Sequence, residues 1–543
     1  MTKLENDILK IIKDDSRHTP QEIAVMLNLD EQKVKETIKS LETNGIIVKY
    51  TAIINDEKMN KDLVEAFIEV KVSPQHNRGF DAIAEEIYQF QEVKSLYLMS
   101  GAYDLAVIVE GKTLKEVAMF VSEKLSSLDK VISTATHFIL KKYKDGRFMF
   151  DMESRLSKRV SGLRPSGIRR FFDLVNEHPD AISLGVGEPD FVTPWNVRDA
   201  AIKSIQKGYT QYTSNWGLAE LREEISIHLN DMYALSYNGK DEILVTVGAS
   251  EAIDLTLRAI ITPGDEVLIP EPSYVSYHPC VVLSDGVPVP VKTELKDDFK
   301  LKPENILSAI TPKTKAIIIP YPNNPTGGIM DKDDLEKIAK VIIEKDLIVI
   351  SDEIYSYLTY SSKHVSIASI PKMRERTFVI NGFSKAFAMT GWRLGFLAAP
   401  KEVLKHIVKI HQYTIMCAPT FSQYAAISAL KNGASDNWSD IMAMRDDYDK
   451  RRRLTVHRFN QMGLKCFEPR GAFYTFPNVS CTGMDGDEFA EKLLDKKKVA
   501  VVPGSVFGDF GKYHVRACYA TAVKSLTEAL NRIEDFVQEY KKI

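Results

Sequence analysis

The sequence predicts a multidomain protein of the α/β class. A small helical domain and a small α+β domain are expected in front of a large domain built on a parallel-rich sheet. The chain has 543 residues, which is too many for one hydrophobic core. Residues 1–143 alternate short helices with short strands, whereas the rest of the chain places longer helices between apolar, β-rich runs. The second pattern is typical of a parallel sheet that is covered on both faces.

Residues 1–50 predict a winged helix-turn-helix. Apolar residues share one face of a first helix near the N-terminus. A second helix starts at Pro20, and Asp30 is placed to cap a third helix over Glu31–Glu42. The segment Ile46–Tyr50 is expected to form the strand of the wing.

Residues 51–143 predict the element order βαββαβ, which is the ferredoxin-like arrangement. The strands are expected over Ala66–Val72, Val93–Met99, Asp104–Val109 and Val131–Leu140, and the helices over Phe80–Phe90 and Leu114–Leu128. The charged segment 144–160 is interpreted as a linker to the large domain, residues 161–543. The strands of that domain are expected over Ile243–Val247, Glu266–Ile269, Ala316–Ile319, Ile348–Ser351, Thr377–Ile380 and Leu394–Ala399.

Composition and charge argue against several classes of protein. The chain has 71 basic and 74 acidic residues, a net charge of -3, so no overall field favours nucleic acid or an anionic membrane. No apolar run approaches the length of a membrane span, about 18 residues, and the N-terminal residues lack the apolar core of a signal segment. The 5 cysteines form no CxxC pair, so we expect core thiols and no metal site. The sequence predicts a cytoplasmic protein without membrane contact.

The segment Asn381–Arg393 (NGFSKAFAMTGWR) follows a predicted strand and carries both a lysine and an arginine. The amine of Lys385 can bond to the aldehyde of pyridoxal phosphate, and it can then carry a proton between the substrate α carbon and the cofactor. Arg393 is placed to bind a phosphate dianion. A lysine close to an arginine is commonly a solvated surface pair, but this sequence context favours a cofactor site.

Three further groups suit the same chemistry. Asp352 lies at the end of a predicted strand, where a carboxylate can pair with a pyridine nitrogen and keep it protonated. It could instead cap the segment that follows. Residues Val247–Ala252 pass from a strand into a helix, whose first N–H groups can hold a phosphate. Arg516 suits an α-carboxylate, because two parallel hydrogen bonds fix the carboxylate plane.

These motifs resemble those of the class I/II aminotransferases, fold type I, from about Arg164 to the C-terminus. The resemblance implies pyridoxal phosphate as cofactor, an amino acid and a 2-oxo acid as substrates, and a homodimer or larger homo-oligomer with shared sites. It implies catalytic roles for Lys385, Asp352 and Tyr355. The other implied cofactor contacts are Ala249, Ser250, Tyr274, Asn324, Arg393 and, on a neighbouring subunit's phosphate, Tyr212; the implied substrate contacts are Gly187, Asn324 and Arg516.

The sequence defines the substrate side chain less clearly. Some aspartate-specific relatives carry a lysine for the distal carboxylate at the position where this chain has Ser250. We expect an aspartate, aromatic or broad L-amino acid donor, and Ser250 disfavours aspartate. Other fold type I reactions, such as those of β-lyases and decarboxylases, share most of these motifs and stay open.

Residues 1–143 resemble the leucine-responsive (Lrp/AsnC) regulators. The resemblance rests on Leu41–Ile47 (LETNGII), on Ser100–Asp104 (SGAYD) and on the βαββαβ order. It implies that the second domain dimerises and binds amino acids around the turn at Gly101. It also implies DNA contacts from the third helix, through Lys33, Lys35 and Lys39.

The charge of the first domain argues against strong DNA binding. Residues 1–50 carry eight basic and nine acidic side chains, a sum of -1. Glu36 stands in the middle of the recognition helix, where related regulators usually have basic side chains. DNA binding needs positive charge at the phosphates, so a module for dimerisation or amino-acid sensing is the other possibility.

The sequence therefore leads to two hypotheses. The first is a pyridoxal-phosphate aminotransferase that is regulated by, or coupled to, an Lrp-like module. The alternative is an amino-acid-responsive transcription regulator that uses its large domain as a sensor of pyridoxal phosphate and an amino acid. We favour the enzyme, because Arg516 and Tyr212 are retained beside Lys385.

Overall fold

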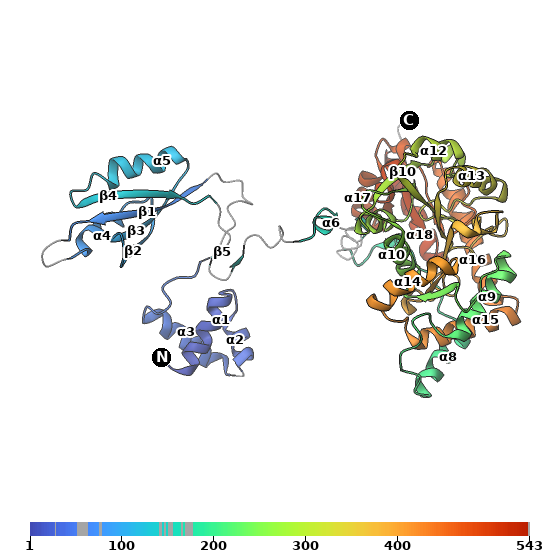
Figure 1. Ribbon diagram of the computed structural model, residues 1–543, viewed down its shortest axis with the longest axis horizontal. Helices are drawn as coiled ribbons and strands as arrows, with labels where there is room; N and C mark the ends of the chain where they lie inside the picture. Colours follow the sequence, from blue (N-terminus) through green and yellow to red (C-terminus); the bar gives the residue numbers. More distant parts are fainter. Residues whose placement is uncertain are drawn as a thin grey trace. The chain divides into compact units, whose positions relative to one another are not determined.

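The computed structural model of the chain divides into two compact units, Met1–Leu156 and Ser157–Ile543 (Figure 1). The residues that the structure describes are 1–27, 29–51, 63–74, 79–140, 144–145, 148–149, 156–163, 167–168 and 178–540. Each unit has hydrophobic cores of its own.

Three helices open the first unit: α1 (Lys3–Asp14), α2 (Pro20–Leu27) and α3 (Glu31–Thr43). The Asp30 side chain caps α3 by accepting from the backbone N–H groups of its first turn, as predicted. The strand predicted over Ile46–Tyr50 is wrong. After α3 the chain turns at Gly45, where φ is +70°, and residues 46–50 pair with no strand in the described part of the chain. An extended segment becomes a strand only through such pairing.

The second part of this unit has the predicted βαββαβ order. Its elements are β1 (Val64–Val72), α4 (Asp81–Ile87), β2 (Val93–Leu98), β3 (Leu105–Gly111), α5 (Leu114–Met119), which continues into a π-helical turn over Phe120–Leu125, and β4 (Val131–Phe138). The sheet order is β2-β3-β1-β4, and all pairs are antiparallel. Alternate residues of β1 are buried against α4 and α5, as period-two patterning requires.

Within the described part of the large unit, seven strands form one sheet in the order β10-β9-β11-β12-β13-β14-β8. They are β8 (Ile243–Thr246), β9 (Glu266–Glu271), β10 (Val287–Lys292), β11 (Thr314–Ile319), β12 (Ile348–Asp352), β13 (Thr377–Gly382) and β14 (Gly395–Ala398). The parallel-rich sheet is confirmed, but β14 runs antiparallel to both of its neighbours. The segment that joins β13 to β14 is a loop without a crossover helix. The chain therefore leaves β13 and enters β14 at the same end of the two strands, which makes the pair antiparallel.

Strand β10 was not predicted. Its sequence, Val-Pro-Val-Pro-Val-Lys, places two prolines where an interior strand needs backbone donors. The structure shows why they are tolerated: β10 is the outer strand of the sheet, and among the described residues it pairs with β9 alone.

Helices cover both faces of this sheet. Side chains of β11 alternate between two cores, with Ala316 and Ile318 in one and Ile317 and Ile319 in the other. The first core includes α10 (Gly248–Ile260), α11 (Tyr277–Leu283) and α14 (Lys401–Thr414), and the second includes α12 (Pro303–Ala309) and α13 (Lys332–Glu344).

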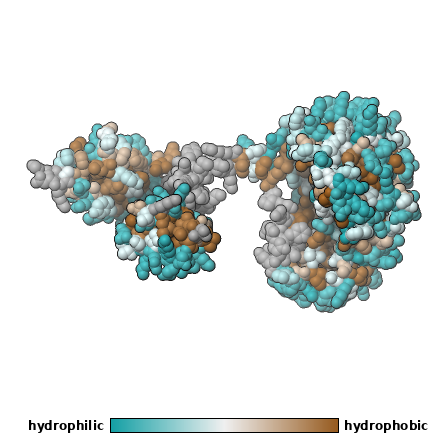
Figure 2. All heavy atoms as spheres, turned by 90° about the horizontal axis from the view of Figure 1, so that it is seen from below, coloured by the Kyte–Doolittle hydropathy of each residue, from teal (hydrophilic) through white to brown (hydrophobic). Residues whose placement is uncertain are grey.

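A further core holds the C-terminal part of the large unit. It gathers α16 (Ser439–Met462), α17 (Gly486–Lys497) and α18 (Val523–Tyr540) around β15 (Tyr474–Thr475), β17 (Val502–Pro503) and β18 (Val515–Cys518). On the outside of the large unit, apolar residues are scattered among hydrophilic ones (Figure 2). Across the described ranges, no helix is long and apolar enough to cross a membrane.

Candidate active site

The described part of the large unit contains a cavity of about 650 Å³ at one edge of the central sheet. Three of its wall residues follow the carboxyl ends of parallel neighbours: Pro320 after β11, Asp352 at the end of β12 and Lys385 after β13. Ligand sites of open α/β sheets form at this edge, because the loops there leave a crevice.

Lys385 is buried in this cavity. Its Nζ donates a hydrogen bond to the Gly187 carbonyl oxygen at 2.7 Å, and it lies 5.8 Å from the ring centre of Tyr355 and 5.7 Å from that of Phe473. Burial lowers the pKa of Lys385 to about 8, against a smaller opposing effect of the Glu188 carboxylate. A sizeable fraction of the side chain is therefore a neutral, nucleophilic amine near neutral pH.

Asp352 is 6% exposed and is held at two points. Its Oδ2 accepts from the Tyr277 hydroxyl at 2.7 Å, and its Oδ1 accepts from the Ile354 backbone N–H at 3.2 Å. Burial raises the pKa of Asp352, while these hydrogen bonds and the charge of Lys385 oppose that rise. Among the described residues no cation forms an ion pair with Asp352, so this carboxylate suits a cationic ligand group.

Arg516, on β18, is 3% exposed and lies at another side of the cavity. Its Nη1 donates to Asn324 Oδ1 at 2.9 Å and its Nη2 to the Gly185 carbonyl oxygen at 2.6 Å. The guanidinium stacks 4.5 Å from the ring centre of Tyr474, and its buried Nε has no hydrogen-bond partner in the described part of the chain. An oriented guanidinium without a neutralising acid is suited to a carboxylate.

The turn from β8 into α10 forms a cradle. Gly248 has a φ of +77°, and a Cβ there would approach the Arg393 Nη2 to 2.9 Å. A Cβ on Gly395 would come within 2.7 Å of the Ala249 backbone nitrogen, so the strand and the helix start pack closely only because both residues are glycine. Ala249, Ser250 and Arg393 all line the cavity. A helix N-terminus beside a guanidinium is a binding site for a dianion.

Most of the predicted site residues lie together. Those that line the cavity are Gly187, Ala249, Ser250, Tyr274, Asn324, Asp352, Tyr355, Lys385, Arg393 and Arg516. Tyr212 is outside this group, because it is 81% exposed and does not line the cavity. Tyr274 meets Tyr277 edge to face, with the ring centres 5.6 Å apart.

Sequence reasoning missed two tyrosines of the site. Tyr277 holds Asp352, and the Tyr474 hydroxyl lies 2.9 Å from that of Tyr355. Tyr277 stands three residues after Tyr274, and Tyr474 lies on β15, which pairs with the strand β18 that carries Arg516. The sequence signal was present, but only the packing shows which groups these hydroxyls reach.

The donor set fits an aromatic aldehyde that carries a phosphate. A buried amine, a buried carboxylate and a cradle for a dianion surround one cavity, and Arg516 lies at its other side. Each part of such a ligand therefore has one matching group, and a carboxylate of a second molecule would face the partly unsatisfied guanidinium.

In the first unit, the three predicted DNA contacts Lys33, Lys35 and Lys39 are exposed on α3. Lys35 forms an ion pair with Glu31 at 2.6 Å, and the other two form none with described residues. In the second domain, the Asp104 Oδ2 accepts from the Val72 backbone N–H at 2.9 Å, which anchors the turn at Gly101.

Three protein families match this chain. Aminotransferase class I and II matches residues 179–533, the Lrp/AsnC ligand binding domain matches residues 65–149, and a winged helix-turn-helix DNA-binding family matches residues 1–48. The fusion that the sequence predicted is confirmed.

Individual relatives align with most of the chain. The putative aminotransferase YugH of Bacillus subtilis is 52% identical over 388 residues, which are 72% of this chain and 100% of YugH. An aspartate aminotransferase of Pyrococcus abyssi is 47% identical over 387 residues, 71% of this chain and 99% of its own length. The crystal structure of an aromatic aminotransferase from Pyrococcus horikoshii has a TM-score of 0.65 and 47% identity, covering 68% of this chain and 99% of that one.

Proposed function

The chain belongs to the class I and II aminotransferases, and from this premise we propose the roles of the residues that line its cavity. It is a pyridoxal-phosphate-dependent enzyme. When bound, the cofactor supplies a protonated pyridine ring that accepts the electrons left when the amino acid loses its α proton.

Lys385 is the catalytic amine, and its position carries the proposal. It is the one lysine among the described lining residues, and its lowered pKa makes a neutral amine available. Lys385 would hold the cofactor through its aldehyde, and as a free amine it would carry the proton to and from the substrate α carbon. In its free form the amine is oriented by the Gly187 carbonyl.

Asp352 and Tyr355 tune the cofactor ring. Asp352 pairs with the pyridine nitrogen, and the hydrogen bond from Tyr277 fixes the direction of its carboxylate. Tyr355 and Asn324, which line the same cavity, would donate hydrogen bonds to the cofactor ring oxygen, and Tyr274 would pack on the ring.

Two arginines would bind the anionic groups of the cofactor and of the substrate. Arg393, with the N–H groups of Ala249 and Ser250, holds the cofactor phosphate. Arg516 holds the α-carboxylate of the substrate, and Gly187 closes the cavity beside it. The α C–H bond is thereby kept near the Lys385 amine, which lowers the entropic part of the barrier.

A donor with a neutral side chain fits the charges of the cavity best. The cations among its described lining residues are Lys385, Arg393 and Arg516, and each already has a proposed partner. Ser250 brings no charge for a second carboxylate. We therefore propose an aromatic or broad L-amino acid donor and a 2-oxo acid acceptor, with aspartate as the weaker candidate, although relatives of both names exist.

The test is to offer purified enzyme one L-amino acid at a time and to follow the absorbance change from the yellow aldehyde form of the cofactor to its amine form. We expect conversion with phenylalanine or tyrosine at a higher kcat/KM than with aspartate. Loss of carbon dioxide or elimination of a side chain, without conversion, would contradict the transamination proposal and favour decarboxylase or β-lyase chemistry.

Capture of the cofactor should depend on pH through Lys385. Only the neutral amine attacks an aldehyde, and burial lowers the pKa of Lys385 to about 8. The capture rate should rise about tenfold per pH unit below that pKa and level off above it. Mixing cofactor-free protein with pyridoxal phosphate at a series of pH values measures this, with Nα-acetyl-lysine as the control for the cofactor's own titration. A midpoint near 10.5, the ordinary lysine value, would contradict it.

We propose that the enzyme acts as a homodimer. Tyr212 is 81% exposed and Tyr413 is 85% exposed, both on the large unit. Large aromatic side chains are more often found at interfaces than left in water. A second copy that covers this surface would let Tyr212 contact the phosphate of the neighbouring site.

A second proposed function is DNA binding by the first domain. The match to a winged helix-turn-helix family and the exposed lysines of α3 support it. The regulator hypothesis would use the same chain differently: an amino acid bound near Gly101, or in the large domain, would change the affinity for DNA.

We expect salt-sensitive binding to a pseudo-palindromic site whose halves are separated by whole helical turns. Each lysine-to-phosphate contact that is removed should lower the slope of log affinity against log salt by about 0.9. Lys33→Gln and Lys39→Gln should show this loss, and Lys35→Gln should show less, because Lys35 is already paired with Glu31. Recovery of no sequence-preferring fragment from a genomic selection at low salt, with and without amino acids, would show that the module does not bind DNA.

A further inference from the structure

Two consecutive arginines, Arg451 and Arg452, lie on α16 and are almost completely buried. Their side chains are 9% and 7% exposed. Consecutive residues of a helix point about 100° apart, so the two guanidinium groups extend toward different segments. Neither lines the cavity. Both nevertheless contact loops that do.

Arg451 holds loop 185–191. Its Nη1 donates to Asp190 Oδ2 at 2.7 Å and to the Thr521 carbonyl oxygen at 2.8 Å. The guanidinium also lies 5.6 Å from the ring centre of Phe191, at the end of the same loop. The Tyr448 hydroxyl, one helical turn away, donates to the other oxygen of Asp190 at 3.3 Å.

Loop 185–191 contributes two backbone oxygens to the site. The Gly185 carbonyl accepts from Arg516 at 2.6 Å, and the Gly187 carbonyl accepts from Lys385 at 2.7 Å. Both groups are thus oriented by a loop that Arg451 and Tyr448 of α16 hold through Asp190. A shift of this loop would move the two acceptors together.

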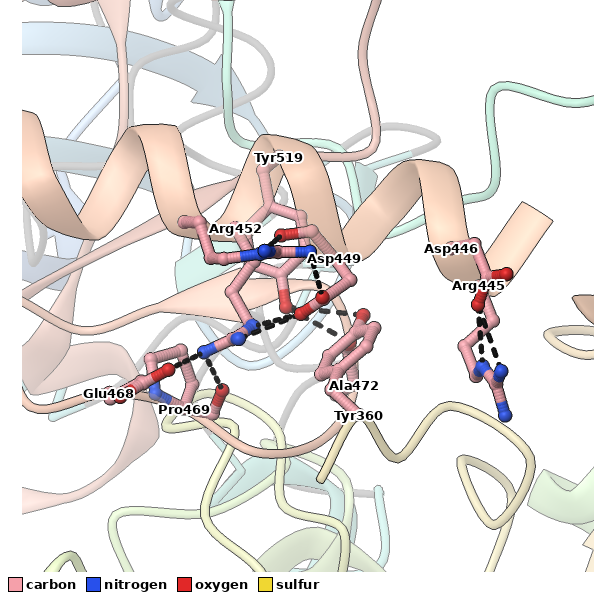
Figure 3. Close-up of polar contacts among 10 residues, drawn as sticks. Tyr360, Arg445, Asp446, Asp449, Arg452, Glu468, Pro469, Ala472 and Tyr519 are labelled. Atoms are coloured by element: carbon pink, nitrogen blue, oxygen red, sulfur yellow. Dashed lines mark hydrogen bonds and ion pairs between the residues drawn. The ribbon is translucent and has the colours of Figure 1, made fainter. Parts of the chain in front are cut away.

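Arg452 holds loop 468–474 (Figure 3). Its Nη1 donates to Glu468 Oε1 at 2.6 Å and to the Pro469 carbonyl oxygen at 3.2 Å, while its Nε donates to Asp449 Oδ1 at 2.8 Å. The same guanidinium stacks 5.2 Å from the ring centre of Tyr360.

The stacked Tyr360 extends this contact along the loop. The Tyr360 and Tyr519 hydroxyls both donate to the Ala472 carbonyl oxygen, and Ala472 has a φ of +56° (Figure 3). The next two residues are Phe473, whose ring faces Lys385, and Tyr474, whose ring faces Arg516. Loop 468–474 therefore supplies aromatic neighbours to the same two groups.

We propose that Arg451 and Arg452 are positioning residues, a pair on α16 that sets the two loops around Lys385 and Arg516. The inference rests on the proposed roles of those two groups. A guanidinium makes several hydrogen bonds in one plane. A lysine at the same place keeps the charge, but all its donors come from one nitrogen atom. Substitution by lysine therefore loosens a loop without removing the cation.

The experiment compares Arg451→Lys and Arg452→Lys with Arg445→Lys. Arg445 lies on the same helix and bonds only to its neighbour Asp446 in the described part of the chain (Figure 3). Steady-state kcat and KM are measured for the best donor, and thermal unfolding is measured in parallel. We expect the KM for the amino acid to rise about tenfold or more in the first two variants, as expected for small misplacements of binding groups, and to stay unchanged in Arg445→Lys.

A second readout does not need the bound cofactor. The Lys385 amine of cofactor-free protein is labelled with trinitrobenzenesulfonate over a pH series and quantified in the peptide that contains it. Loosening of loop 185–191 admits water, so the midpoint of labelling should move upward in Arg451→Lys, toward the value of a solvated lysine. Arg445→Lys should match the wild type.

Unchanged KM and an unchanged Lys385 midpoint in both variants would overturn the proposal. So would a loss of activity that only follows a lower unfolding temperature, because that result assigns the arginines to stability alone. If the wild-type enzyme converts no amino acid at all, the proposed function fails, whereas the labelling midpoint still decides whether Arg451 positions the loop.

Discussion

Lys385→Ala is expected to abolish transamination and to leave the fold intact. Alanine can neither bond to the cofactor aldehyde nor carry the α proton. General acid–base catalysis alone contributes about 10²- to 10⁴-fold, so the rate should fall by at least that factor. Burial of the native amine costs stability, which offsets the loss of its hydrogen bond to Gly187 and of its contacts with the rings of Tyr355 and Phe473. The free energy of unfolding should therefore change little.

The measurement is a single-turnover reaction with the best donor, followed by absorbance. Lys385→Arg is the matched control, because arginine keeps a cation but stays protonated and cannot act as the base. Added methylamine should restore part of the rate in Lys385→Ala and none in Lys385→Arg, where the space is filled. An alanine variant that turns over within about tenfold of the wild type, a loss smaller than removal of the acid–base step gives, would mean that another group moves the proton.

Most of the residues that the sequence predicted for the site line one cavity, whereas strand β10 and the direction of β14 were not predicted. Lys385 and Arg393 were found as a pair, and the structure shows the physical reason that they meet: the loop from β13 to β14 starts and ends at one edge of the sheet. Asp352 was predicted from its place at a strand end. These residues could be predicted because their side-chain chemistry and their positions beside predicted strands both indicate the same kind of site.

Packing between segments that are far apart in the sequence could not be predicted from the sequence. The antiparallel direction of β14 depends on the length and path of one loop, and local propensity carries no information about it. The prolines of β10 are tolerated because the strand lies at the edge of the sheet. Tyr277 could not be assigned, because its hydroxyl meets Asp352 across the fold, 75 residues away in sequence. The segment Ile46–Tyr50, which was predicted as a strand, begins with three β-branched residues but has no partner strand within the described ranges.

Asp352→Asn should retain the cofactor and lose most of the rate. An amide cannot keep the pyridine nitrogen protonated, so the ring would accept electrons from the α carbon less well. Removal of one preorganised charge of this kind costs about 10²- to 10³-fold in kcat, or roughly 3 to 4 kcal/mol. The amide oxygen can accept from the Tyr277 hydroxyl, but the amide nitrogen cannot accept from the Ile354 N–H, so the side chain keeps one of its two hydrogen bonds.

Stability separates this catalytic effect from structural damage. Asp352 is 6% exposed, and burial raises its pKa, so the neutral amide avoids a desolvation cost. This gain offsets the lost hydrogen bond from the Ile354 N–H, so the thermal unfolding midpoint should change little. Tyr277→Phe is the matched control: it removes the donor to Asp352 but keeps the carboxylate, so its loss of kcat should be smaller. Both variants are compared by kcat at saturating donor and by thermal unfolding of the cofactor-free form, so that a change in cofactor affinity does not enter the unfolding midpoint. An Asp352→Asn enzyme with wild-type kcat would place the partner of the pyridine nitrogen elsewhere in the cavity, and a lower unfolding midpoint would mean that Asp352 acts through the fold.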